Sequence, residues 1–310
     1  MSEQKIGYIF PGQGAQYVGM GKDLVEQFAV AADVFETANK ALGFDLSKLC
    51  FEGPLEDLTQ SAVCQPAVLT LSTAVLEVLK SEFPEMSPAI CAGLSLGEYS
   101  ALVACASLKF EDALRLVNKR GQFMDEASAI NPGTMSCLLG VETDKARQIC
   151  EQSGAEIANL NCPGQIVISG TKQAIEQAND LARQAGAKRV IPLEVSGPFH
   201  CSLMSPAADK LTSELAQVLI NKPACPFICN VTADYTDDPN SIKDMLIQQV
   251  AHTTRWHDSI LRMKEAGVNT FFEIGPGKVL RGLMNRIDRG IEVINLENAD
   301  DFSKIGTREN

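Results

Sequence analysis

The sequence predicts an α/β protein in which a small ferredoxin-like domain is inserted into a larger α/β domain. Apolar strands alternate with helical patterns along most of the 310 residues. Residues 93–97 form a G-x-S-x-G motif between a short apolar strand and a helix, and residues 134–195 follow the order strand–helix–strand–strand–helix–strand. We therefore expect the large domain to comprise residues 1–130 and 197–310, and the small domain to comprise residues 131–196.

The large domain begins with an apolar strand predicted over residues 6–10, which runs into a Pro-Gly-Gln-Gly turn at residues 11–14. This turn lacks the G-x-G-x-x-G spacing and the G-K-[ST] sequence of nucleotide-binding loops, and its backbone N–H groups instead suit a position beside the G-x-S-x-G motif. We predict helices after it at 18–42, 66–82, 97–106 and 110–129. The most apolar stretch contains Pro66 and several hydroxyl groups, which indicates a buried helix rather than a membrane span.

The small domain begins where the pattern changes, at Asn131-Pro132-Gly133. We predict strands at 134–141, 155–161, 165–169 and 188–195, and helices at 143–153 and 171–186. Six elements in this order, joined by short loops, are typical of a ferredoxin-like domain. For the rest of the large domain we predict strands at 225–231 and 270–274 and helices at 241–251, 257–266 and 278–289. The last ten residues are polar, and we expect them to be frayed.

Composition and charge restrict the function classes. With 45% hydrophobic and 21% charged residues the chain is typical of globular proteins, and its net charge of −12 argues against nucleic acid or an anionic membrane as a partner. The ten cysteines are scattered without a C-x-x-C pair, and the first residues lack the apolar core of a signal peptide. We therefore expect a cytoplasmic, monomeric protein without a metal site.

The G-x-S-x-G motif predicts that Ser95 is a nucleophile. The two glycines allow a sharp turn between strand and helix, so that the Ser95 hydroxyl is exposed at the N-terminus of the helix. The unpaired backbone N–H groups and the helix dipole favour negative charge there. The alternative is that Ser95 only caps the helix after a glycine turn.

A serine nucleophile needs a base, and the chain has three histidines: His200, His252 and His257. His200 follows a Gly-Pro pair that predicts a loop leaving a strand, and we favour it as the base. The other two lie in a polar stretch and are typical of surface or capping histidines. Glu194 is the one carboxylate close to His200 in the sequence. We therefore expect a Ser-His dyad, oriented by a carbonyl or amide group, rather than a Ser-His-Asp triad.

Six motifs occur in order along the chain: FPGQGAQ at 10–16, GLSLGEYSA at 93–101, RGQFM at 120–124, FHCSLM at 199–204, NV at 230–231 and EIGPG at 273–277. In these motifs the sequence resembles the malonyl-CoA:acyl carrier protein transacylases, an acyltransferase family of fatty acid and polyketide synthesis. The resemblance spans about residues 6 to 290. It implies an α/β-hydrolase-like large domain with a ferredoxin-like insertion, in agreement with the order of elements predicted above.

The resemblance also implies a reaction. A malonyl group would pass from malonyl-CoA to the phosphopantetheine thiol of acyl carrier protein through a malonyl-serine intermediate, in a ping-pong sequence that supplies fatty acid synthesis. Ser95 would attack the thioester, and His200 would take its proton and later protonate the leaving thiol. The backbone N–H groups of Gln13 and Leu96 would form the oxyanion hole. No cofactor is implied, since malonyl-CoA is a substrate.

Three further positions follow from the resemblance. Arg120 matches the arginine that pairs with the malonyl carboxylate, a contact that a buried carboxylate requires. Gln249 matches the glutamine associated with the active-site histidine, although the adjacent Gln248 leaves the register open. Leu94 stands where the family usually has histidine. This departure leaves the breadth of acyl specificity open.

Two other functions use the same residues. A serine esterase or thioesterase would share Ser95 and His200 and differ in releasing the acyl group to water. A non-catalytic module that binds a carrier protein is the other alternative, and intact Ser95, His200 and Arg120 argue against it. A carrier protein is typically acidic, so that docking would need a local basic patch on this chain. The alternative is that the basic residues of the helix predicted at 278–289 only form a solvated face. The candidate docking residues are Arg189, Lys278, Arg281, Arg286 and Arg289.

Overall fold

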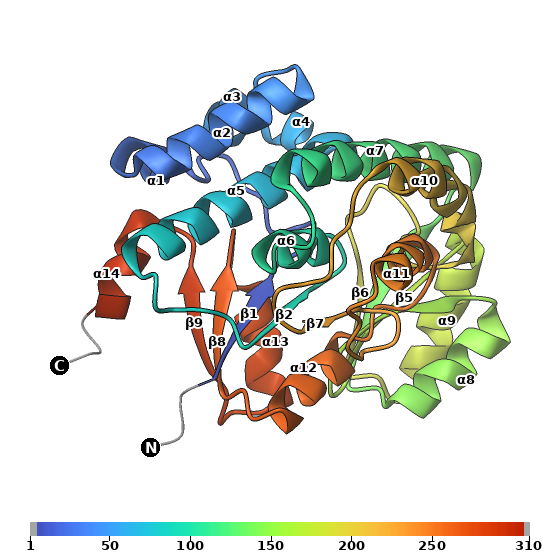
Figure 1. The fold of residues 1–310 in the computed structure, drawn as a ribbon. Helices are drawn as coiled ribbons and strands as arrows, with labels where there is room; N and C mark the ends of the chain where they lie inside the picture. Colours follow the sequence, from blue (N-terminus) through green and yellow to red (C-terminus); the bar gives the residue numbers. More distant parts are fainter. Residues whose placement is uncertain (1–4, 307–310) are drawn as a thin grey trace.

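The computed structural model describes residues 5–306, and the first and last four residues lie outside the described part. Figure 1 shows a sheet flanked by helices, with a second, smaller sheet beside it; the first has five strands and the second four. The large sheet is parallel with the order β7-β2-β1-β8-β9, and the small sheet is antiparallel with the order β4-β5-β3-β6. The predicted fold class is therefore confirmed.

The strands of the large sheet are β1 (Ile6–Phe10), β2 (Ile90–Gly93), β7 (Phe227–Ile228), β8 (Thr270–Ile274) and β9 (Glu292–Leu296). Alternate residues of β1 enter two different cores: Tyr8 and Phe10 pack with helix α5, and Ile9 packs with helices α12 and α13. Because helices cover both faces, the strand is apolar throughout. Neighbouring parallel strands end at the same edge of a sheet. The turn after β1, at residues 11–14, and the turn after β2, at residues 94–96, therefore lie side by side.

The helices of the large domain are α1 (Lys22–Gln27), α2 (Ala29–Leu42), α3 (Leu46–Glu52), α4 (Leu55–Thr59), α5 (Ser61–Glu82), α6 (Gly97–Ala104), α7 (Phe110–Ile130), the 3₁₀ turn η1 (Ser202–Met204), α10 (Ser205–Gln217), α11 (Pro239–Ala251), α12 (Trp256–Glu265), α13 (Val279–Ile287) and α14 (Ala299–Gly306). Helix α5 is long and apolar enough to cross a membrane, but 83% of its most apolar window is buried inside the protein. It is the buried core helix that the sequence predicts.

The small sheet carries the elements β3 (Thr134–Leu139), α8 (Thr143–Ser153), β4 (Glu156–Cys162), β5 (Gln165–Gly170), α9 (Lys172–Gln184) and β6 (Arg189–Pro192). Their order confirms the ferredoxin-like arrangement, whereas the domain limits at residues 131 and 196 stay a prediction. Strand β4 also binds the loop between α11 and α12: Leu160 N–H donates to Thr254 O over 2.9 Å, and Thr254 N–H donates to Ala158 O over 2.8 Å. These bonds hold the small sheet against the large domain.

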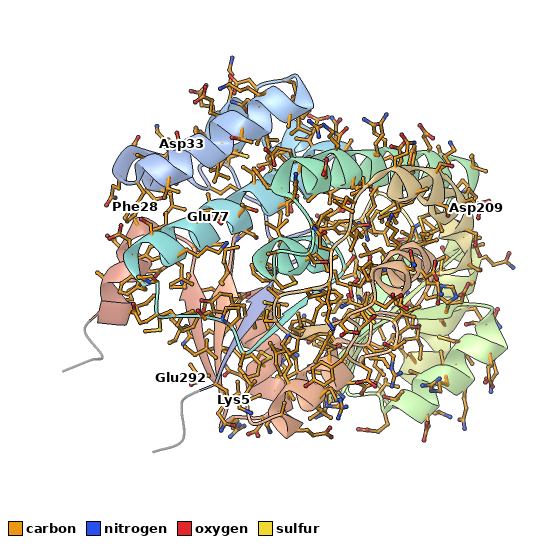
Figure 2. The ribbon with its side chains drawn as sticks, in the orientation of Figure 1. Lys5, Phe28, Asp33, Glu77, Asp209 and Glu292 are labelled. Carbon is orange, nitrogen blue, oxygen red and sulfur yellow. The ribbon has the colours of Figure 1, made fainter. Side chains whose placement is uncertain are left out.

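Several elements differ from the sequence prediction. The strand predicted at 225–231 is reduced to the two residues of β7, since Pro226 has no N–H to donate. Helix α10 and strand β9 were not predicted, and neither were the short helices α3 and α4. The expectation that the last ten residues are frayed is wrong as far as Gly306, because helix α14 packs Phe302 edge-on against Phe28, with ring centroids 5.7 Å apart. Phe28 is labelled in Figure 2.

The two glycines of the G-x-S-x-G motif are required by close backbone contacts. A Cβ atom on Gly93 would lie 2.0 Å from the carbonyl carbon of Gly97, and a Cβ on Gly97 would lie 2.2 Å from the Phe10 carbonyl oxygen. Both distances are far below van der Waals contact with backbone atoms, which cannot move aside as a flexible side chain can. Strand β1 therefore passes directly behind the turn and sets how tightly helix α6 can follow β2.

We predict that Gly97→Ala lowers the free energy of unfolding by at least about 2 kcal/mol, because the new methyl group overlaps backbone atoms of β1. Gly282→Ala is the matched control: Gly282 lies inside helix α13 with no atom within 4 Å of the added Cβ. Alanine there should raise the free energy of unfolding by about 0.5–1 kcal/mol. Urea denaturation followed by circular dichroism measures both; equal changes in the two variants would contradict the packing argument.

Candidate active site

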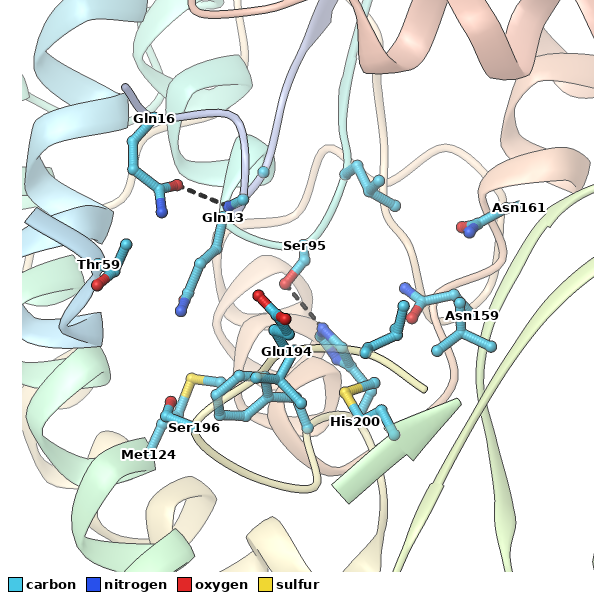
Figure 3. A pocket seen from close by; sticks show the side chains of 18 of the residues that line it. Gln13, Gln16, Thr59, Ser95, Met124, Asn159, Asn161, Glu194, Ser196 and His200 are labelled. Carbon is cyan, nitrogen blue, oxygen red and sulfur yellow. Dashed lines mark hydrogen bonds between the residues drawn. The ribbon is translucent and has the colours of Figure 1, made fainter. Parts of the chain in front are cut away.

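A cavity of about 390 Å³ lies where the carboxyl ends of β1 and β2 face the small sheet. Ser95 and His200 point toward each other inside it, and Asn159 and Asn161 of β4 project from the opposite wall (Figure 3). The residues that line it are Gly12, Gln13, Gly14, Gln16, Thr59, Leu94, Ser95, Arg120, Met124, Met135, Asn159, Asn161, Val167, Leu193, Glu194, Val195, Ser196, Phe199 and His200. Both sheets therefore contribute to one cavity.

Ser95 occupies the turn between β2 and α6 with a φ of 54°, in the left-handed region that a serine rarely adopts. Asn230 stabilises this turn from both sides. Its Oδ1 accepts the Ser95 backbone N–H at 2.6 Å, and its Nδ2 donates to the Gly93 carbonyl at 2.7 Å. The strained backbone is thus held by a buried side chain from another segment, and the Ser95 hydroxyl projects into the cavity.

His200 lies 2.8 Å from Ser95, measured from its Nε2 to the hydroxyl Oγ. Its other ring nitrogen, Nδ1, lies 2.8 Å from the backbone carbonyl of Gln249. Because a carbonyl can only accept, Nδ1 carries the proton and Nε2 presents its lone pair to the Ser95 hydroxyl. Within residues 5–306 no carboxylate hydrogen-bonds to His200; Glu194 lies on the cavity wall. The geometry is that of a dyad oriented by a carbonyl group.

The surroundings of His200 keep its imidazole neutral. Burial, and next the nearby charge of Arg120, lower the pKa of His200 from its ordinary 6.5 to about 4. Both effects disfavour the imidazolium, since one removes its hydration and the other repels its charge. At neutral pH the ring is therefore able to accept a proton from Ser95.

Arg120 is buried in helix α7, with 1% of its surface exposed, and its guanidinium enters the same cavity. One terminal nitrogen donates to Gln65 Oε1 at 2.8 Å. The other donates to Gln249 Oε1 at 2.9 Å and to the Ser95 hydroxyl oxygen at 3.1 Å. The structure therefore places Arg120 beside Ser95 and away from solvent. Its Nε has no hydrogen-bond partner among the described residues.

Gln249 connects these groups through its side chain as well as its carbonyl. Its amide nitrogen donates to the Ser95 backbone carbonyl at 2.9 Å and to a carboxylate oxygen of Glu98. Glu98 is completely buried, also accepts the Asn230 backbone N–H, and has a raised pKa because burial disfavours its charge. The amide thus bridges the Glu98 carboxyl and the Arg120 guanidinium, and it is Gln249 rather than its neighbour Gln248 that reaches the site.

Gln13 and Leu96 are the candidates for backbone N–H donors to a bound oxygen atom. Gln13 lies in the turn after β1 and lines the cavity, and Leu96 directly follows Ser95 at the start of α6. Within the described part of the chain neither N–H donates a hydrogen bond, so that both are available to an oxygen atom of a ligand. Their role as an oxyanion hole stays a prediction.

Of the remaining candidates, the two other histidines and the cations do not line the cavity, whereas Leu94 does. His252 and His257 do not line the cavity, and His252 contacts the Gln248 carbonyl through Nδ1. Arg281 donates to Asn295 and, with Lys278, lines a separate cavity of about 160 Å³. Leu94 lines the main cavity and packs against the core cluster that contains Trp256. Arg286 reaches from α13 to Gln165 of β5, and Arg189 is exposed on β6.

Sequence reasoning missed the roles of Gln65, Glu98 and Asn230, which hold the reacting groups in place. One signal was available: Gln65 is an amide residue in the largely apolar stretch that forms α5. A buried polar residue in such a helix needs a partner, and here the partner is Arg120. Among residues 5–306 no group of three or more His, Cys, Asp or Glu side chains could hold a metal ion.

Comparisons with known proteins agree with this geometry. The chain matches the acyl transferase domain family over residues 7–298. It is 48% identical to the malonyl CoA-acyl carrier protein transacylase of Bacillus subtilis over 94% of this chain and 92% of that protein. The crystal structure of an acyl carrier protein S-malonyltransferase from Vibrio cholerae superposes with a TM-score of 0.94 at 42% identity, covering 97% of this chain and all of the other.

A further solved structure includes a partner protein. It contains a malonyl-transacylase in complex with a type II PKS acyl-carrier protein. The transacylase chain superposes with a TM-score of 0.94 at 37% identity, covering 97% of this chain and 98% of the other.

We predict that Ser95 reacts with a fluorophosphonate probe at a nearly constant rate from neutral pH down to about pH 5. The rate should fall to half near pH 4, because only then does His200, with its pKa of about 4, become protonated and lose the lone pair that accepts the serine proton. The measurement is the labelling rate against pH, with circular dichroism at each pH and Ser95→Ala as the unlabelled control. A half-point near 6.5 would show that His200 titrates as an ordinary histidine.

Proposed function

The chain belongs to the acyl transferase domain family, and on this premise we propose that it transfers a malonyl group from malonyl-CoA to the phosphopantetheine thiol of acyl carrier protein, for fatty acid biosynthesis. The observation that carries the proposal is the arrangement around one oxygen atom. The Ser95 hydroxyl lies 2.8 Å from a neutral histidine and 3.1 Å from a buried guanidinium. The first contact activates a nucleophile, and the second attracts an acyl group that itself carries a carboxylate.

In the first half-reaction Ser95 attacks the thioester carbonyl of malonyl-CoA while His200 Nε2 accepts its proton. The carbonyl oxygen gains negative charge, and the N–H groups of Gln13 and Leu96 stabilise it. The tetrahedral intermediate then expels CoA, whose sulfur takes the proton back from His200. This leaves a malonyl ester on Ser95.

In the second half-reaction the phosphopantetheine thiol replaces CoA in the same place. His200 is neutral again and accepts the thiol proton as the sulfur attacks the ester carbonyl. Ser95 leaves as the alcohol after His200 returns the proton to its oxygen. The two thiols thus use one site in turn, which is the structural basis of ping-pong kinetics.

Arg120 supports malonyl recognition because its orientation is fixed before substrate binds. Gln65 and Gln249 each occupy one N–H of its two terminal nitrogens, and the malonyl carboxylate would take the place of the Ser95 oxygen beside it. The pairing has a second effect. Because the charge of Arg120 lowers the pKa of His200, a carboxylate that neutralises this charge makes His200 a stronger base when malonyl is bound.

We propose that the carrier protein docks on two cations, Arg189 of β6 and Arg286 of α13. Arg286 contacts β5 through Gln165, which places its charge at the junction between α13 and the small sheet. Lys278 precedes α13 and Arg281 lies in its first turn. Both would contact the edge of a larger partner. A local patch of this kind offsets the net charge of −12, which repels an acidic carrier.

We place the enzyme in the cytoplasm, acting as a monomer. All ten cysteines are free thiols, which suits a reducing compartment. The cavity is complete within one chain, since every group assigned to the reaction comes from the same 310 residues.

Intact mass spectrometry after brief incubation with malonyl-CoA tests the proposed function. We expect a malonyl adduct on the wild-type protein and none on Ser95→Ala, which lacks the nucleophile. Acyl carrier protein or CoA should discharge the adduct quickly and water slowly. An adduct that water clears at once would instead indicate a hydrolase with the same dyad.

We predict that Arg120→Ala lowers kcat/KM for malonyl-CoA by about 100-fold or more, while acetyl-CoA is used as well as before or better, because the carboxylate loses its charge-assisted partner. Arg115→Ala is the matched control: it removes an exposed arginine of the same helix that pairs with Asp112. Steady-state transfer rates with both thioesters measure the change. Unchanged malonyl selectivity in Arg120→Ala would refute the clamp.

We predict that Arg286→Glu raises the KM for acyl carrier protein about three- to tenfold and leaves the KM for malonyl-CoA unchanged, because the charge reversal repels an acidic partner. Arg183→Glu, an exposed reversal on α9, is the control for the change in net charge. Initial rates with each substrate varied separately give both constants. Equal effects of the two reversals would remove Arg286 from the docking surface.

A further inference from the structure

Three thiols lie close together at β2, the strand that leads to Ser95. Cys91 belongs to β2, Cys105 follows the last residue of α6, and Cys225 precedes β7. The Sγ atoms of Cys91 and Cys225 lie 3.6 Å apart. Backbone hydrogen bonds hold the three segments together: Cys91 N–H donates to Pro226 O at 2.9 Å, and Ala224 N–H donates to Cys105 O at 2.8 Å.

Cys225 is also the accessible member of the group. Nine of the ten cysteines are buried, and Cys225 alone is intermediate in exposure. It lines a cavity of about 360 Å³ together with Phe227, Tyr235 and the exposed ion pair between Lys222 and Asp237. This cavity shares no residue with the one that contains Ser95. A small reagent can therefore reach the Cys225 sulfur from solvent without entering the active site.

We propose that Cys225 and Cys91 form a peroxide-sensitive thiol pair that closes into a disulfide. The Cys225 thiolate attacks one oxygen of a hydroperoxide, the O–O bond breaks, and a sulfenic acid forms on Cys225 while hydroxide or an alkoxide leaves and takes up a proton. The Cys91 sulfur then attacks the Cys225 sulfur, water leaves with the Cys91 proton, and the S–S bond forms. Two thiols and one hydroperoxide thus give a disulfide, a water molecule and the reduced peroxide.

The neighbouring thiols favour Cys225 as the attacking group. Hydrogen bonds from Cys105 and then from Cys91 lower the pKa of the Cys225 thiol far below its ordinary 9.0, although burial opposes the shift. The same contact with Cys225 raises the pKa of both neighbours. The thiolate is the reactive form of cysteine, and a lowered pKa favours it at the partly exposed sulfur.

The two sulfur atoms must move closer together before a disulfide bond can form. A disulfide has an S–S length of about 2.05 Å, so the two sulfurs must approach by about 1.5 Å from their present separation of 3.6 Å. Cys225 lies outside β7, in a segment that contains two prolines and no helix or strand. The inference does not depend on the proposed function.

The test is to treat the purified, reduced full-length protein with hydrogen peroxide and to map disulfides by mass spectrometry of non-reduced peptides. We expect a Cys91–Cys225 linkage, the loss of two of the ten thiols in a titration under denaturing conditions, and full recovery with dithiothreitol. Cys225→Ala and Cys91→Ser should each prevent the linkage. Cys150→Ser removes a buried thiol of α8 remote from the group, and it should form the disulfide as the wild type does.

The outcomes separate the proposal from its alternatives. Three results would each overturn it. The first is a loss of thiols in Cys225→Ala equal to that in the wild type. The others are a linkage from Cys225 to Cys105, and oxidation of other cysteines before Cys225. The thermal unfolding curve and the far-UV circular dichroism spectrum, compared with those of the wild type, show whether Cys225→Ala is folded. A folded variant that resists peroxide, beside a wild type that forms the linkage, supports the assignment.

Discussion

The arrangement of the active site depends on the hydrogen bonds of one buried residue, Gln249, near the end of α11. Its carbonyl accepts from His200, its side-chain oxygen accepts from Arg120, and its amide nitrogen donates to Ser95 O and to Glu98. Ser95, His200 and Arg120 belong to three different segments of the chain. A single amide and its own carbonyl set all three relative to one another, so that a shift of α11 would move them together.

The same contacts explain why a dyad suffices here. In a triad a carboxylate orients the histidine and stabilises its protonated form. Here a neutral carbonyl supplies the orientation, and the positive charge nearby belongs to Arg120, which opposes protonation. The buried carboxyl group, Glu98, is separated from His200 and faces Gln249 and Asn230 instead. The ring is thereby kept neutral before each half-reaction, and the charge of a bound acyl group adjusts its basicity.

Local sequence patterns predicted the features that depend on residues close together in the chain. The turn around Ser95 and the order of the small sheet follow from glycines and apolar runs that are contiguous in the chain. Helix α10 was missed because Ser205-Pro206 is typical of a turn, although proline also suits the first turn of a helix. The partners of Arg120 could not be predicted from local pattern, since Gln65 and Gln249 approach it from α5 and α11. Such contacts are determined by the packing of whole helices.

Ser95 and His200 share one backbone property: both have a positive φ, 54° and 59°, although neither is glycine. A left-handed conformation costs a residue with a Cβ atom about 1–2 kcal/mol. Glycine at either position would relieve this cost and remove the reactive side chain. Selection for thermal stability alone would therefore favour the loss of both side chains, as it would favour glycine at Ala106 and Ala233, which have the same positive φ.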